Sequence, residues 1–124
     1  MELDLSHLPR GTPRIAGAEV KWQEGTRAYR GSRYRAPARL PDDVAERLRE
    51  AALTAFQSLQ LRDYARLDFR VTAKGDVYLI EANPNPYLHS SSEFIKGARA
   101  SGRTHPGTIL EIVRLAFARY GMRL

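Results

Sequence analysis

A short glycine-containing link between two alternating segments is the feature that most restricts the fold of this chain. Residues 63–72 and 76–83 both read as half-buried strands, with apolar and polar side chains alternating most clearly in the first. The link at residues 73–76 reads Ala-Lys-Gly-Asp, and a short link with glycine favours a tight hairpin. Pro84 and Pro86 follow the second segment and stop it. The sequence therefore predicts an antiparallel hairpin that ends near residue 83.

The register of this hairpin places two acidic side chains opposite each other. If residues 74–75 form the turn, Asp68 faces Glu81, and by the same register Arg66 faces Asn83. Opposed side chains lie about 4.5–5.5 Å apart at Cβ, where like charges are destabilising. A divalent ion bound by Asp68, Glu81 and the Asn83 amide would relieve this repulsion, and oxygen ligands favour Mg²⁺ or Mn²⁺. The alternative is a solvated charged face, and a shift of one residue in the turn would remove the pairing.

The same register predicts one apolar face for the hairpin, with the arginine, the two acids and the asparagine on the other. The expected members of the apolar face are Ala65, Leu67, Phe69 and Val71 on the first strand and Tyr78, Ile80 and Ala82 on the second.

Composition restricts the class of protein. A chain of 124 residues with 43% hydrophobic and 27% charged residues is typical of one globular domain. It contains no cysteine, which excludes disulfides and zinc–thiolate sites. No apolar run approaches the roughly 18 residues of a membrane span, and no secretory signal pattern is present, so we expect a cytoplasmic protein. The net charge of +6 favours anionic partners.

The rest of the pattern predicts an α+β domain. Residues 1–12 read as an irregular lead-in, residues 13–22 as an extended segment, and residues 23–41 as a long, flexible, basic loop. Residues 41–59 have the spacing of an amphipathic helix, residues 91–101 read as a short helix closed by Gly102, and Pro106 opens a last helix. We therefore expect an antiparallel sheet with helices packed on one side, incomplete in strands.

Two motifs in order and spacing resemble a known family. Residues 66–69 read Arg-Leu-Asp-Phe, and residues 81–86 read Glu-Ala-Asn-Pro-Asn-Pro. Together they resemble the C-terminal part of ATP-grasp ligases of the D-alanine–D-alanine ligase-like group. Residues 19–22, Glu-Val-Lys-Trp, are similar to the family segment that precedes a mobile substrate-covering loop. The resemblance extends over nearly the whole chain from about Pro13.

The resemblance implies an ATP- and Mg²⁺-dependent carboxylate–amine ligase. In that family ATP converts a carboxylate to an acyl phosphate, which an amine then attacks, and two metal ions bridge the nucleotide phosphates. The resemblance implies that Asp68, Glu81 and Asn83 are metal ligands and that Arg66 stabilises the acyl phosphate or tetrahedral intermediate. By the same resemblance Lys21 reaches the transferring phosphate. Ser92 falls at the position of a serine near the acceptor carboxylate, as a substrate-binding residue.

The chain also departs from the family. D-alanine–D-alanine ligases have glycine where this chain has Tyr87, which we expect to be a substrate-binding residue. A bulky side chain at this position argues against D-alanine itself as the substrate. The family's N-terminal domain, ATP-covering glycine-rich loop and adenine-binding segment have no counterpart here. We therefore expect this chain to be a C-terminal fragment whose partners are ATP, amino-acid or peptide substrates and the missing ATP-covering portion. Many relatives are dimers, so a homodimer is an option, whereas no membrane partner is expected.

Two other readings stay open. A noncatalytic remnant of the ATP-grasp fold could keep the charged face without turnover. Arginines interleaved with tyrosines within residues 27–39 could instead bind single-stranded nucleic acid by charge and stacking, a reading ranked below the ligase. The three histidines lack metal-ligand spacing, and the serines at residues 90–92 favour helix capping over covalent chemistry.

Overall fold

The computed structural model describes residues 1–17, 20, 23 and 25–123, and the chain divides into two compact units, Met1–Ala38 and Arg39–Leu124. The sequence predicts a single domain instead. Lys21, the predicted phosphate-contacting residue, lies outside the described residues. None of the described helices is long and apolar enough to cross a membrane. Each unit has its own pair of antiparallel strands.

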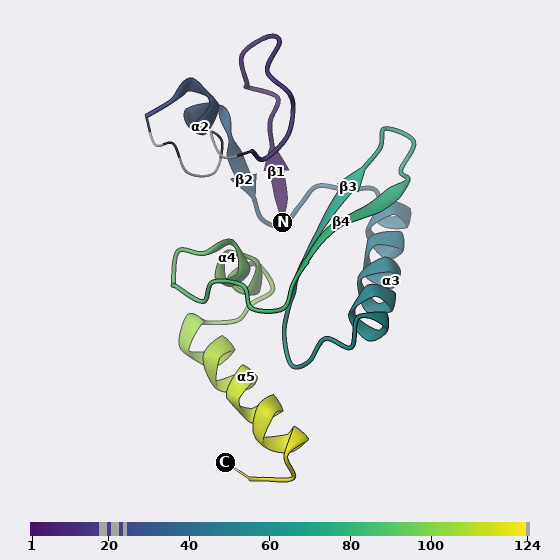
Figure 1. The fold of residues 1–124 in the computed structure, drawn as a ribbon, viewed down its shortest axis with the longest axis vertical. Coiled ribbons are helices and arrows are strands. Elements are labelled where there is room, and N and C mark those ends of the chain that lie inside the picture. Colours follow the sequence, from purple (N-terminus) through teal and green to yellow (C-terminus); the bar gives the residue numbers. More distant parts are fainter. Residues whose placement is uncertain (18–19, 21–22, 24, 124) are drawn as a thin grey trace. The chain divides into compact units, whose positions relative to one another are not determined.

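The first unit holds a small antiparallel sheet of two strands, β1 (Glu2–Asp4) and β2 (Arg33–Arg35), with the short helix α2 (Arg27–Gly31) before β2 (Figure 1). Arg35 lies 3.7 Å from a carboxylate oxygen of Glu2 across the strand pair. Residues 1–12, predicted to be irregular, therefore contain a strand. Residues 13–17, the described part of the predicted extended segment, form no strand. The prediction that residues 23–41 form a loop is wrong for α2 and β2, and its flexibility stays a prediction.

The second unit is built on the predicted hairpin, β3 (Arg66–Val71) and β4 (Val77–Asn83). Helix α3 (Asp42–Ser58) packs against β4, and helices α4 (Glu93–Ala100) and α5 (His105–Arg119) contact each other beyond the end of β4 (Figure 1). The predicted α+β class is confirmed, as are the three helices. Helix α3 begins after Pro41 with two acidic residues in its first turn, which complement the helix dipole.

The hairpin register differs from the prediction at the turn but agrees at the charged pair. Thr72 N–H donates to Asp76 O at 3.0 Å, so the loop has three residues, and Gly75 takes φ of 84° within it. Phe69 then pairs with Leu79, and a bulge between residues 68 and 69 of β3 restores the expected pairing of Asp68 with Glu81. The extra residue is Ile80 on β4. The extra residue in the loop and the extra residue in the bulge each shift the register by one, and the two shifts cancel before the pair of Asp68 and Glu81.

The bulge changes the expected apolar face. Tyr78 pairs with Arg70, so it lies on the face of the charged residues, and Leu79 lies opposite Phe69 in its place. Ile80, the bulge residue, is 66% exposed. The prediction that Tyr78 and Ile80 belong to the apolar face is wrong, because a bulge shifts the alternation of every residue between it and the turn.

Gly75 is required by both its backbone and its surroundings, which gives a paired stability prediction. A Cβ there would lie 2.8 Å from Arg47 Nη2 and 3.1 Å from Val44 Cγ2, at a positive φ that costs L-residues about 1–2 kcal/mol. A Cβ added at Gly97, inside α4, would meet no other atom within 4 Å. We expect Gly75→Ala to lower the free energy of unfolding by about 1–2 kcal/mol and Gly97→Ala to raise it by about 0.5–1 kcal/mol.

Urea unfolding of both variants at unchanged m-value measures these differences. Changes of the same sign in the two variants would contradict the conformation of the turn or the position of Gly97 in the helix.

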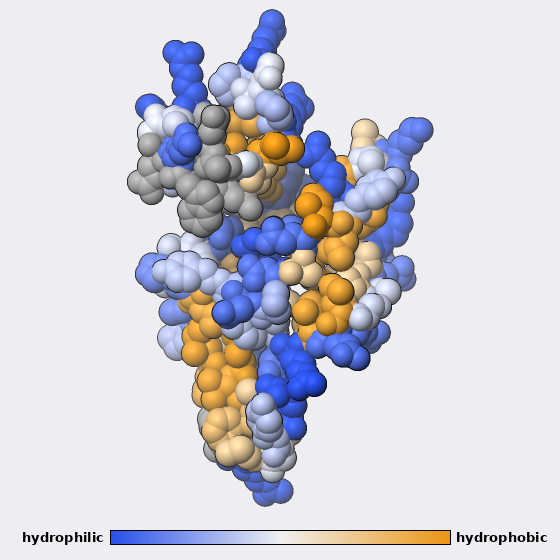
Figure 2. Space-filling view, viewed as in Figure 1, coloured by the Kyte–Doolittle hydropathy of each residue, from blue (hydrophilic) through white to orange (hydrophobic). Residues whose placement is uncertain are grey.

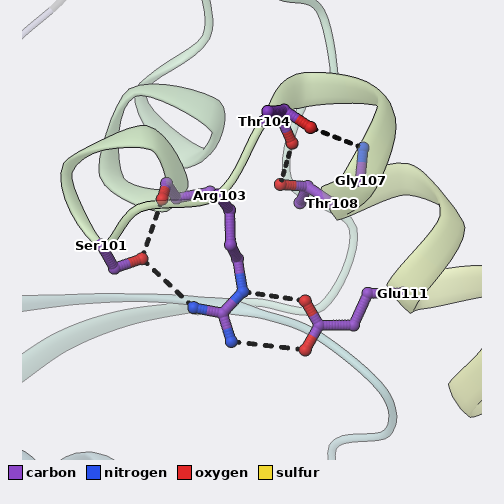
Figure 3. A network of polar contacts seen from close by, with 7 residues as sticks. Ser101, Arg103, Thr104, Gly107, Thr108 and Glu111 are labelled. Atoms are coloured by element: carbon purple, nitrogen blue, oxygen red, sulfur yellow. Dashed lines mark hydrogen bonds and ion pairs between the residues drawn. The ribbon is translucent and has the colours of Figure 1, made fainter.

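The connection between α4 and α5 is fixed by polar contacts (Figure 3). Arg103 forms a bidentate ion pair with Glu111, with hydrogen bonds of 2.8 and 3.3 Å, and also donates to the Ser101 hydroxyl. The Arg103 hydrogen bond and charge hold the pKa of Glu111 below its ordinary value. Thr104 caps α5, since its hydroxyl accepts from Gly107 N–H at 3.1 Å. These contacts fix the end of α4 to the start of α5.

Much apolar surface of the second unit stays uncovered. Ile95 and Pro86 are its largest fully buried described side chains, with Val44 also buried. Apolar colour gathers over α5 and over the part formed by the hairpin and α3 (Figure 2). Residues that contribute exposed apolar surface include Leu53, Leu59, Tyr78, Leu79, Ile80, Leu110, Val113 and Leu115.

Candidate functional site

Four of the predicted residues lie together on one face of the hairpin. Arg66 pairs with Asn83 and Asp68 with Glu81 in the observed register. Direct partners in an antiparallel pair share a face, and residues two apart on one strand do the same, so these four side chains form a compact square, the charged face. The sequence prediction of which residues meet there is confirmed.

Arg66 is the centre of the charged face. Its Nε and Nη2 donate to the two carboxylate oxygens of Asp68 at 2.9 and 3.1 Å, and its Nη2 lies 3.7 Å from Glu81 Oε1. A further group comes from α4, where Glu93 Oε2 lies 3.9 Å from Arg66 Nη1. Burial alone would lower the pKa of Arg66, but the Asp68 hydrogen bond and the three carboxylate charges outweigh it and raise that pKa. One guanidinium therefore faces three carboxylates.

Glu93 is the member of this cluster that the sequence did not predict. It stands in the first turn of α4, where an acidic residue reads only as a partner of the helix dipole. Its position beside Arg66 depends on the path of residues 84–92. This loop has no helical or strand periodicity from which its path could be predicted. The signal that existed was its place directly after the predicted substrate-binding Ser92.

The donor set of the charged face suits a hard divalent cation. Among the residues that the structure describes, no three acidic or histidine side chains lie close enough to bind a metal ion alone. Asp68, Glu81 and Asn83 offer two carboxylates and an amide, and the Asp68 oxygens keep lone pairs beyond their hydrogen bonds to Arg66. Mg²⁺ typically takes one or two carboxylates and completes its shell with water and substrate phosphates. The residues therefore fit Mg²⁺ held jointly with a nucleotide.

The loop after β4 forms the neighbouring surface. An open depression there is lined by Asn83, Asn85, Pro86, Tyr87, Leu88 and His89. Tyr64 O–H donates to Asn85 Oδ1 at 2.9 Å, and Asn85 N–H donates to Asn83 Oδ1 at 3.0 Å. These bonds fix the loop against the end of the hairpin, so the depression adjoins the charged face through Asn83.

The two predicted substrate-binding residues have different environments. Tyr87 is 71% exposed, and its ring stacks on that of His89 with the ring planes 10° apart. Ser92 is 5% exposed, and its hydroxyl accepts from Ile95 N–H at 3.3 Å as the N-cap of α4. The predicted capping role of the serine run is confirmed at Ser92. Substrate contact by either residue stays a prediction.

The residues of the charged face lie within a segment that is similar to known proteins. Residues 19–114 match the family described as D-ala D-ala ligase C-terminus. D-alanine–D-alanine ligase B of Chromobacterium violaceum is 39% identical over 80 residues, covering 64% of this chain and 26% of that protein. The D-alanine–D-alanine ligase of Nocardia farcinica is 40% identical over 83 residues, covering 67% of this chain and 23% of that protein.

A solved structure agrees with these matches. The D-alanine–D-alanine ligase of Bacillus anthracis, complexed with ATP, matches with a TM-score of 0.64 and 27% identity over 70% of this chain and 31% of that one. The chain spans about a quarter to a third of the length of these relatives. Its matched segment includes the whole charged face and the loop after β4. The chain therefore belongs to the D-alanine–D-alanine ligase C-terminal family and has the C-terminal part of the ATP-grasp ligase fold.

Proposed function

We propose that this chain is the C-terminal catalytic part of an ATP- and Mg²⁺-dependent carboxylate–amine ligase that works through an acyl phosphate. The observation that supports this most directly is the opposed pair Asp68 and Glu81 with Arg66 between them, inside the segment that matches the ligase family. One guanidinium does not balance the three carboxylates around it, so the face keeps negative charge, which favours a cation-binding role. A ligase that activates a carboxylate with ATP needs such a cation to bind the nucleotide phosphates.

The residues of the charged face have separate roles in this proposal. Asp68, Glu81 and Asn83 hold the cation, which when bound with ATP neutralises charge on the phosphate oxygens and so assists transfer of the terminal phosphoryl group. A guanidinium has five N–H donors and Asp68 accepts from two of them, so Arg66 is proposed to donate the others to the acyl phosphate or to the tetrahedral intermediate, which lysine cannot do in the same planar geometry. Lys21 is proposed to contact the transferring phosphate, on the family resemblance alone.

The reaction balances without an external oxidant or reductant. A carboxylate oxygen of the donor attacks the terminal phosphorus of ATP, and ADP leaves. The amine nitrogen of the acceptor then attacks the acyl carbon, inorganic phosphate leaves, and the nitrogen gives up a proton. The depression at Tyr87 and the α4 N-cap at Ser92 are proposed to hold the acceptor beside Arg66.

The proposal is tested on the protein isolated from its source cells with an antibody to α5, so that any portion that accompanies this chain is retained. The protein is incubated with Mg²⁺, ATP and a mixture of D- and L-amino acids. We expect ADP and a ligated product, identified by mass spectrometry, in a one-to-one ratio. ADP without a product, or neither, would favour the noncatalytic remnant.

Tyr87 gives a prediction about the acceptor. Its exposed ring stands where D-alanine–D-alanine ligases have glycine, so it should restrict the approach of the acceptor to the end of β4. We expect Tyr87→Gly to raise kcat/KM for D-alanine as acceptor by about 10-fold, the size of one pocket contact. Steady-state kinetics with D-alanine and with larger D-amino acids measure the change.

The matched control is Tyr120→Gly. Tyr120 is also 71% exposed but lies at the C-cap of α5 and does not line the depression. An equal change in both variants, or no change in either, would remove Tyr87 from the acceptor site.

A further inference from the structure

The partners of Arg66 fall into two groups once a cation is considered. Asp68 and Glu81 lie on the hairpin and are the proposed cation ligands, whereas Glu93 comes from α4 and is not among them. Asp68 takes two hydrogen bonds from Arg66, and the two glutamates lie 3.7 and 3.9 Å from it. Of the three described carboxylates around Arg66, Glu93 is the one that is not also a proposed cation ligand.

A cation at the charged face would weaken two of these contacts. A carboxylate shared between Mg²⁺ and a guanidinium divides its oxygen lone pairs between them, and the two positive groups repel each other across it. Arg66 would then be held less firmly by Asp68 and Glu81, at the stage when its fork must face the acyl phosphate. A third carboxylate that does not bind the cation would keep the guanidinium in place.

Glu93 is well placed to do this because α4 is fixed at its start. Ser92 caps the helix, and the side chain of Ile95 is fully buried. Phe94, next to Glu93, packs its ring edge-on to Tyr64 with the centroids 5.6 Å apart. Tyr64 in turn donates to Asn85 in the loop after β4. The first turn of α4 is therefore tied to the loop that follows β4.

We infer that Glu93 is a positioning residue that holds Arg66 in place when Asp68 and Glu81 bind a cation. This inference rests on the proposed function, since it assigns a further residue to the same site. Glu93 is expected to matter little for nucleotide affinity, because it lies beside Nη1 of Arg66, whereas the proposed cation ligands lie beside Nε and Nη2. It is expected to matter for turnover, because a misplacement of about 1 Å can lower a rate by up to about 100-fold.

The first test uses NMR on the protein with Mg²⁺ alone. The Nε–Hε signal of Arg66, assigned by its loss in Arg66→Lys, is followed as Mg²⁺ is added. In the wild-type protein we expect the signal to shift and stay observable. In Glu93→Gln we expect Mg²⁺ to abolish it, because a released guanidinium exchanges its proton with water.

A structural role of Glu93 is separated by two further variants. Asp42→Asn removes an acidic residue from the same first position of α3, away from Arg66, and should leave the Arg66 signal as in the wild type. Glu93→Asp keeps the charge at the helix start but shortens the side chain, so it should keep the helix while weakening the hold on Arg66. An Arg66 signal that persists with Mg²⁺ in both Glu93 variants would overturn the inference.

A wild-type signal that Mg²⁺ does not move would also overturn it, because Asp68 would not then be shared. Kinetics give the second readout. In the active protein we expect Glu93→Gln to lower kcat by about 10-fold or more while KM for ATP changes little. Unchanged kcat would overturn the inference with ligation intact, whereas absence of ligation in the wild type would count against the proposed function and leave the NMR result to decide on Glu93.

Discussion

Asp68→Asn and Glu81→Gln are each expected to lower ATP-dependent ligation by at least about 100-fold, comparable with the loss of one preorganised electrostatic contact to a transition state. Each change replaces a charged oxygen ligand by a neutral amide on a face where the two carboxylates oppose each other. A neutral amide binds Mg²⁺ more weakly and leaves the phosphate charge less compensated. The measurement is kcat/KM at several Mg²⁺ concentrations, with raised Mg²⁺ expected to restore part of the activity.

The control for both variants is Glu50→Gln, which removes an exposed carboxylate from α3. Thermal unfolding of all three proteins separates loss of the fold from loss of the chemistry. Near-normal ligation by either hairpin variant, with saturating or low Mg²⁺, would end the assignment of that residue as a cation ligand.

Arg66→Ala is expected to lower kcat by about 100-fold or more, with a much smaller change in KM for ATP. The reason is that its guanidinium is assigned to charge that develops during the reaction, not to the bound nucleotide. Arg66→Lys keeps one positive charge but loses the fork that donates to Asp68 at 2.9 and 3.1 Å, so it should recover only part of the loss. Single-turnover measurements with ATP in excess isolate the chemical step.

Arg70→Ala is the matched control, because Arg70 lies on the same strand and the same face but opposite Tyr78. An effect of Arg66→Ala that is confined to KM for ATP would argue against its assigned role. Removal of Arg66 also leaves three carboxylates without their shared guanidinium, so we expect added Mg²⁺ to protect this variant against unfolding more than it protects the wild type.

The second unit could be predicted from the sequence because its signals are long. Helix α3 shows its period over 17 residues, and Val44, Leu48 and Phe56 on one face of it are buried or half-buried. The hairpin shows alternation in its first strand, a glycine turn, and prolines that end its second strand. Proline at the start of α5 marks that helix. Signals of this length survive local errors of one residue.

The first unit could not be predicted in the same way. Strands β1 and β2 have three residues each, fewer than the four to eight over which alternation can be read. Their pairing joins residues about 30 positions apart, so its stability comes from tertiary contact and not from local preference. The extended pattern over residues 13–17 carried apolar residues but had no partner strand among the described residues.

The charged face was predictable to the extent that one hairpin carries it. Arg66, Asp68, Glu81 and Asn83 are brought together by local register, which the sequence contains. Glu93 reaches Arg66 only through the path of the loop after β4 and the start of α4, which depend on contacts such as that of Tyr64 with Asn85. The bulge lies in a run of four adjacent apolar residues, Val77 to Ile80, where alternation is absent and the register cannot be read from the sequence.

The bulge at Ile80 has a consequence for how gene sequences of relatives should be aligned. A relative with one residue fewer in the three-residue loop, or without the extra residue at Ile80, can still place an aspartate opposite a glutamate, because the pairing at residues 68 and 81 does not depend on either position. A gap between residues 66 and 68, or between 81 and 83, instead turns one side chain to the opposite face of the strand. Gaps within residues 73–80 are therefore compatible with a shared site, and gaps inside the two motifs are not.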